Sequence, residues 1–163
     1  MITIRKVLLS LACVLALGAG SSLAQNDLYA GASTGIDLFV GDAYFNFNTY
    51  LGFEDLISEG VDVRANLGII AIGDLLVKLG GDALFAFQFD GGSPITVFAG
   101  GGPRLVFGSA TDVGIGVVGN FDYALQPDIS LFGEFDLDLY FASGITNNTT
   151  FAPGIDVGVR FKF

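Results

Sequence analysis

The chain has 163 residues, of which seven are basic and seventeen acidic, so its formal net charge is −10 at pH 7. This acidity argues against nucleic acid as a partner, because nucleic-acid binding needs a basic surface. The mean hydropathy is nevertheless positive, at +0.63. The sequence contains no histidine and a single cysteine, Cys13, which excludes an internal disulfide and any metal site built from imidazole or several thiols.

The N-terminal residues have the pattern of a secretory signal peptide. Arg5 and Lys6 precede an apolar run from Val7 to Gly18, and the small residues Ser22 and Ala24 form a small-x-small cleavage motif directly before Gln25. The run is too short to span a bilayer as a helix, and no later apolar run reaches the roughly 18 residues that a spanning helix needs. We therefore predict a signal peptide over residues 1–24 and a single domain over 25–163, with an uncleaved membrane anchor as the alternative for the first segment.

The rest of the chain consists of segments in which apolar residues occupy every second position. Alternation of this kind predicts β-strands with one apolar and one polar face. Short turn signals rich in Gly, Asp, Pro and Ser separate most of the segments. In chain order the predicted strands cover residues 28–40, 43–54, 61–72, 76–90, 95–108, 112–125, 129–141 and 151–163. A polar connection is expected over residues 55–60.

One stretch of this pattern is ambiguous. In residues 67–80 the polar face carries Ile70, Ile72 and Leu76. A hairpin turning near Gly73 and Asp74 is the simplest interpretation, and a short helix is the alternative because some of these residues also fit helical spacing.

The last segment, Phe151 to Phe163, has the clearest pattern. One face carries only apolar residues, including Val157, Val159 and Phe161, whereas the other carries small or charged residues, including Asp156 and Arg160. A strand of this length with a wholly apolar face is typical of a membrane β-barrel, which faces lipid outside and a polar lumen inside. Eight such segments predict an all-β fold, an eight-stranded antiparallel up-and-down transmembrane β-barrel.

Charges and aromatic residues are segregated in the same way. In the predicted domain every basic residue lies on the polar face of its segment, and thirteen of the sixteen Phe residues lie on apolar faces. A lipid bilayer favours this segregation, because a charge at the lipid face of a barrel costs roughly 2–4 kcal/mol at the midplane. A soluble secreted ligand-binding β-barrel, with the apolar face as its core, is the alternative interpretation.

These features resemble the small eight-stranded outer-membrane β-barrels of bacteria, a group that includes OmpA-like, OmpX-like and opacity-type barrels. The resemblance implies the bacterial outer membrane as the location, the lipid bilayer as a partner and both termini on the periplasmic side. It also implies that Val159, Phe161 and Phe163 are the signal read by the barrel-assembly machinery. The predicted connections are shorter than the long loops of the better-known members, which argues against an adhesion role.

Charged residues inside such a barrel must be paired, because an unpaired buried charge is very costly. We predict a lumen charge network, which makes the barrel a structural component with a largely plugged lumen. It comprises Arg64, Lys78, Asp82, Arg104, Glu134, Asp136, Asp138, Asp156 and Arg160. Acids exceed bases on the inward faces. The alternative function is therefore that unpaired carboxylates, such as the row Glu134, Asp136 and Asp138, coordinate small cations in the lumen or line a narrow cation-preferring channel. Since outer-membrane enzymes of this size use His with Ser or Asp, we expect neither catalysis, a cofactor nor a dedicated metal site.

Overall fold

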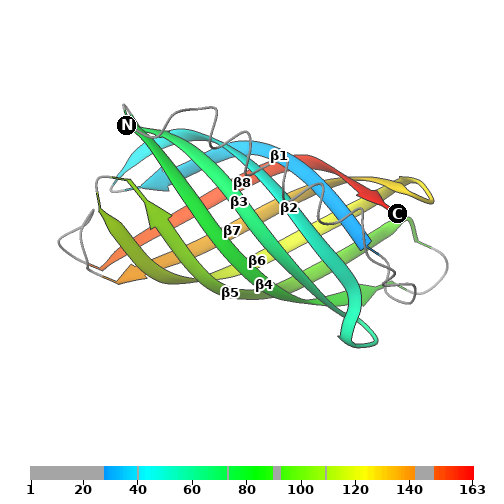
Figure 1. Cartoon of the computed structure of the whole chain (residues 1–163). Helices are drawn as coiled ribbons and strands as arrows, with labels where there is room; N and C mark the ends of the chain where they lie inside the picture. The colour runs from blue at the N-terminus through cyan, green and yellow to red at the C-terminus, as the bar shows by residue number, and fades with distance from the viewer. Residues whose placement is uncertain (1–27, 40, 73, 90–92, 109, 142–148) are drawn as a thin grey trace.

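The computed structural model of the chain describes residues 28–39, 41–72, 74–89, 93–108, 110–141 and 149–163. Within these ranges the chain forms eight strands that close into one antiparallel barrel in sequence order (Figure 1). This confirms the predicted all-β, eight-stranded up-and-down barrel. The strands are β1 (Leu28–Phe39), β2 (Asp42–Ser58), β3 (Val61–Ile72), β4 (Asp74–Gln88), β5 (Ile95–Phe107), β6 (Thr111–Gln126), β7 (Ile129–Phe141) and β8 (Thr150–Lys162).

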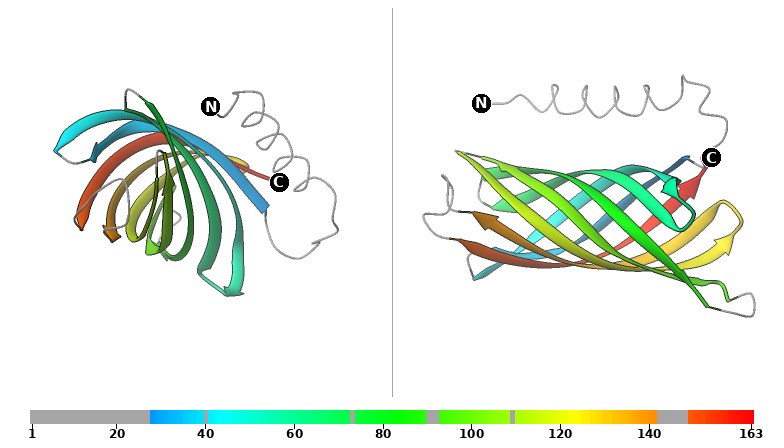
Figure 2. Two further views of the ribbon diagram at one scale, coloured as in Figure 1. Left: turned by 60° about the vertical axis from the view of Figure 1, so that its left-hand side comes forward. Right: turned by 90° about the horizontal axis from the view of Figure 1, so that it is seen from below.

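The barrel closes where β8 pairs with β1, for example through Ile36 opposite Ile155. All strands incline to the long axis in the same sense, as two further views show (Figure 2). The start of β1 and the end of β8 lie at the same end of the barrel (Figure 1), together with the connections β2–β3, β4–β5 and β6–β7. We call this the terminal end, and the other the opposite end. The predicted signal peptide, residues 1–24, lies outside the described residues, among which no helix is long and apolar enough to cross a membrane.

The ambiguous stretch is a hairpin. β3 and β4 pair with Leu67 opposite Leu79 and with Ile70 opposite Leu76, so the alternative of a short helix is wrong. Ile70 and Leu76 are almost completely buried inside the barrel. They interrupt the polar face because they belong to an apolar layer of the interior, described below.

The expected polar connection over residues 55–60 is wrong, because β2 continues to Ser58. The pairing of β2 with β3 shifts between Phe53 and Ser58, which marks an irregularity of the β-bulge type. Asp55 has a φ of 53°, and its carboxylate accepts a hydrogen bond of 2.6 Å from the backbone N–H of Gly60. Asp and Asn tolerate this left-handed conformation better than most residues. Asp55 therefore stabilises the end of the β2–β3 hairpin and is not part of a loop.

The outer surface of the barrel is apolar, as the alternation predicted. Val117 is 63% exposed and Phe45 is 62% exposed. Most exposed aromatic side chains lie near one end of their strand or the other, and aliphatic residues such as Ile115, Val117 and Leu137 lie between them. The exposed aromatic residues include Phe85, Phe87, Phe121, Tyr123, Phe161 and Phe163 toward the terminal end and Phe45, Phe47, Phe141 and Phe151 toward the opposite end.

The interior is filled in layers. An apolar layer toward the opposite end contains Phe39, Ile70, Leu76, Val106, Tyr140 and Ala152. Two clusters toward the terminal end contain Tyr29, Tyr50 and Phe132, and Leu84, Phe98 and Val118. Charged side chains occupy the space between these layers. An eight-stranded barrel encloses a space that side chains nearly fill, and this distribution shows which side chains fill it.

Candidate functional site

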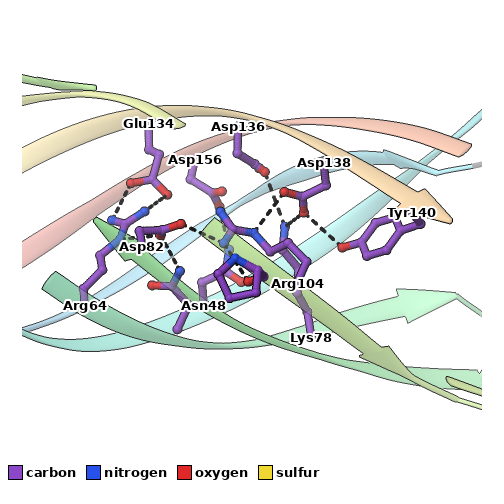
Figure 3. A network of polar contacts seen from close by, with 12 residues as sticks. Asn48, Arg64, Lys78, Asp82, Arg104, Glu134, Asp136, Asp138, Tyr140 and Asp156 are labelled. Carbon is purple, nitrogen blue, oxygen red and sulfur yellow. Dashed lines mark hydrogen bonds and ion pairs between the residues drawn. The ribbon is translucent and has the colours of Figure 1, made fainter. Parts of the chain in front are cut away.

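The candidate site is the charged middle layer of the lumen. Each of its side chains lies at an inward-facing position of its strand, because alternate residues of a strand face opposite sides of the sheet. Seven of the nine residues predicted for the lumen network form one continuous set of ion pairs (Figure 3). These are Arg64, Lys78, Asp82, Arg104, Glu134, Asp136 and Asp138, which we call the central network.

Arg64 forms the first junction of the central network. Its Nη1 and Nη2 donate to the two carboxylate oxygens of Glu134 at 2.6 and 2.8 Å, and its Nε donates to Asp82 Oδ2 at 2.9 Å. The side chain of Asn66 donates to the same oxygen of Asp82 at 2.6 Å. A bidentate arginine–carboxylate pair has strict geometry, so Arg64 ties β3 to β7 across the lumen.

Arg104 and Lys78 extend the network toward the opposite end. Arg104 Nη1 lies 2.7 Å from Asp82 Oδ1, and Arg104 Nε donates to Asp138 Oδ1 at 3.0 Å. Lys78 Nζ lies 2.7 Å from Asp138 Oδ2 and 3.4 Å from Asp136 Oδ2. Tyr140 also donates to Asp138 Oδ2, at 3.0 Å. Both carboxylate oxygens of Asp138 are therefore engaged, whereas Asp136 has the longer contact with Lys78.

Arg160 lies apart from the central network. Its guanidinium group is 4.6 Å from the ring centre of Tyr29 and 4.9 Å from that of Phe98, and its Nη1 lies 2.8 Å from Asp122 Oδ2. Ser130 donates a hydrogen bond to the same oxygen at 3.1 Å. The alternation placed Asp122, Tyr29 and Phe98 on inward faces, but their proximity to Arg160 was not predicted because it depends on the register across four strands.

Asp156, the ninth predicted residue, has a different environment. Its Oδ1 accepts a hydrogen bond of 3.2 Å from Asn48. One oxygen from each of Asp37, Asp136 and Asp156 lies within 4.8 Å of the other two, and all three residues are buried. We call these residues the carboxylate trio. Asp37 was not among the predicted site residues, although its position in the alternation of β1 placed it on the inward face.

The terminal end of the lumen opens into a cavity of about 350 Å³. Its lining includes the acidic residues Glu54, Asp55, Glu59 and Asp62, with Lys162 on its rim. Lys162 forms an ion pair of 2.6 Å with Glu54. Phe98 forms part of the wall, so this mouth ends at the aromatic layer that surrounds Arg160.

The fold is that of the small eight-stranded outer-membrane barrels. The structure of Neisserial surface protein A (NspA) matches with a TM-score of 0.65 and 18% sequence identity over 85% of this chain and 97% of that one. A major outer membrane protein from Thermus thermophilus matches with a TM-score of 0.68 and 15% identity over 85% of this chain and 100% of that one. The outer membrane enzyme PagL matches with a TM-score of 0.56 and 13% identity over 82% of this chain and 98% of that one. No protein-family model and no curated protein sequence matches the chain.

Proposed function

We propose that the protein is an integral β-barrel of a bacterial outer membrane, with a structural role in the envelope and a plugged lumen. The observation that carries this proposal is the apolar outer surface, on which most exposed aromatic residues, Phe135 excepted, lie toward one end of the barrel or the other. Aromatic girdles of this kind lie at the two membrane–water interfaces of outer-membrane barrels. In water the same surface would be a very large exposed apolar patch, which soluble proteins avoid.

The content of the lumen supports the structural role over transport. The central network joins β3, β4, β5 and β7 by ion pairs, and it lies between the apolar layer around Ile70 and the aromatic layer around Arg160. A conducting pore needs a continuous aqueous path, and three filled layers in series obstruct one. The narrow cation-preferring channel is therefore the competing function that the experiment must test.

The proposal includes export by the predicted signal peptide and assembly through β8. Phe161 and Phe163 are exposed on the outer face of the barrel, and Val159 is half-buried there. These side chains are available to the barrel-assembly machinery before β8 closes the sheet on β1. The proposal includes no enzymatic activity, because the chain has no histidine and the carboxylates of the central network are held in ion pairs.

The proposal is tested by fractionation and conductance. The protein should sediment with the outer membrane of a Gram-negative host and run at a different gel mobility when it is not heated. When reconstituted in planar bilayers, it should give no steady conductance steps, whereas a porin measured in the same bilayers provides the positive control. Steady cation-preferring steps would reject the plugged lumen, and recovery in the soluble periplasmic fraction would reject the membrane location.

A further inference from the structure

The charges in the middle of the lumen do not balance. The central network contains three bases and four acids, namely Arg64, Lys78 and Arg104 against Asp82, Glu134, Asp136 and Asp138. Asp37 and Asp156 lie beside it without an ion pair among the described residues. Three negative charges are therefore in excess. Burial of uncompensated charge is strongly unfavourable, so this layer must hold either protons or a cation.

The uncompensated acids gather at one point, where the barrel closes. Gly154 of β8 pairs with Asp37 on the neighbouring strand β1 and with Asp136 on the other neighbouring strand, β7. A side chain at Gly154 would collide with both carboxylates, so the absence of a Cβ there lets them approach each other. Asp156 follows two residues later on the same inward face. The carboxylate trio thus comes from three adjacent strands.

Polar groups around the trio lack partners. Asp37 is 3% exposed, and within the described part of the chain neither of its carboxylate oxygens accepts a hydrogen bond. Asn46 is completely buried and its amide approaches Asp37 without good hydrogen-bond geometry, while its amide oxygen has no partner among the described residues. Buried polar atoms are normally satisfied. A cation bound at this place would satisfy these atoms and offset the excess of negative charge.

There is room for a ligand beside the trio. A cavity of about 20 Å³ is lined by two residues of the trio, Asp136 and Asp156, and by Asn48, Ser33 and Arg104 among other residues, whereas Asp37 lies outside its lining. A cavity of roughly 10–15 Å³ measured in this way already holds one water-sized species. Lys78 also borders the cavity, but its shorter contact is with Asp138, at 2.7 Å. Its ammonium group therefore neutralises Asp138 most closely and Asp136 at the longer distance of 3.4 Å, which leaves Asp37 and Asp156 without a basic partner among the described residues.

We propose that the carboxylate trio binds one divalent cation of the hard, oxygen-preferring class, with Ca²⁺ as the best fit. Ca²⁺ binds oxygen at about 2.3–2.6 Å, so ligand oxygens on opposite sides of the ion lie roughly 4.6–5.2 Å apart. The oxygens of the trio lie within 4.8 Å of one another, which is no farther apart than two oxygens on opposite sides of one Ca²⁺ ion. The amide oxygen of Asn46 can provide a further ligand. Mg²⁺ fits less well, because it demands shorter bonds in near-ideal octahedral geometry.

The test is calorimetric titration of the detergent-purified protein, first treated with a chelator, with CaCl₂ and separately with MgCl₂. We expect one Ca²⁺ per chain, weaker binding of Mg²⁺ and a higher melting temperature in Ca²⁺ than in chelator. Asp37→Asn and Asp156→Asn remove one ligand charge each with almost no change in shape. Each variant should weaken Ca²⁺ binding by at least about tenfold, the order of loss seen when the supporting shell of a metal site is altered.

Asp62→Asn is the matched control. Asp62 is also buried and also has one unpartnered carboxylate oxygen among the described residues, but it lies at the acidic mouth of the terminal end. The Asp62→Asn substitution should leave Ca²⁺ binding unchanged. Loss of binding in Asp62→Asn but not in the trio variants would place the ion at the mouth and overturn the proposal. Absence of Ca²⁺ and Mg²⁺ binding in the unaltered protein, with a higher melting temperature for Asp37→Asn, would show that the trio holds protons instead. None of these outcomes depends on whether the barrel conducts.

Discussion

Replacement of Val117 by Arg tests whether the outer face of the barrel contacts lipid. Val117 lies on the outer face of β6 with 63% of its surface exposed, opposite Gly101, the middle residue of β5. If this face contacts lipid, the charge is placed near the midplane, where Arg costs about 2–4 kcal/mol. Because each 1.4 kcal/mol is a factor of ten, the folding equilibrium should shift by roughly 30- to 1000-fold.

Leu125→Arg is the matched control, since Leu125 lies on the same face of the same strand and is 52% exposed. The separation between the two positions along the strand corresponds to roughly 20 Å along the membrane normal, given a rise of about 3.3 Å per residue and the usual strand tilt. Leu125 therefore lies at the membrane–water interface, where the same substitution costs about 0–1 kcal/mol. The assay is reversible urea unfolding in lipid vesicles, followed by circular dichroism. Equal destabilisation by the two variants would refute the assigned depth, and no effect from either would refute the lipid-facing surface itself.

Three other predictions concern the lumen and assembly. Arg64→Ala should lower the unfolding free energy by about 3–5 kcal/mol, because it leaves buried carboxylates unpaired. Lys162→Ala at the half-exposed rim should lower it by less than about 1 kcal/mol, and similar values for both variants would contradict the buried network. Gly154→Ala should destabilise by about 1–3 kcal/mol through overpacking, whereas Gly119→Ala, which meets no described atom within 4 Å, should be tolerated, as thermal unfolding would show. Phe163→Ala should lower the amount of folded barrel in the outer membrane of cells without altering refolding in detergent, and a normal amount in cells would argue against the assembly signal.

The sequence predicts the barrel well because two-residue periodicity reports directly on which face each side chain occupies. In β6 exposure alternates without interruption from Asp112 to Asp122, and the apolar residues follow it except at Val118 and Gly119. The pattern fails where the interior itself is apolar. Ile70 and Leu76 face inward because they belong to the apolar layer of the lumen, so their hydrophobicity does not report a lipid-facing position.

The end of β2 shows a second limit of periodicity. The residues from Asp55 to Ser58 read as a polar connection, yet they continue the strand beyond an irregular pairing. The deciding interactions are the hydrogen bonds that join Asp55 to Gly60 and to Asp62. Local composition does not contain this information, because a left-handed Asp within a hairpin and an Asp in a loop look the same in sequence.

The inward-facing residues could be predicted, but their grouping could not. Glu134, Asp136 and Asp138 follow one another on the same face of β7, and the sequence suggests that they act as one row. Across the lumen, however, Glu134 meets Arg64, Asp138 meets Arg104, and Asp136 lies with Asp37 at the barrel closure. Successive inward residues of a tilted strand face different strands on the far side. The register of eight strands therefore decides which acids are neutralised by arginine and which remain in excess, and this is why the candidate cation site is visible only once the barrel is closed.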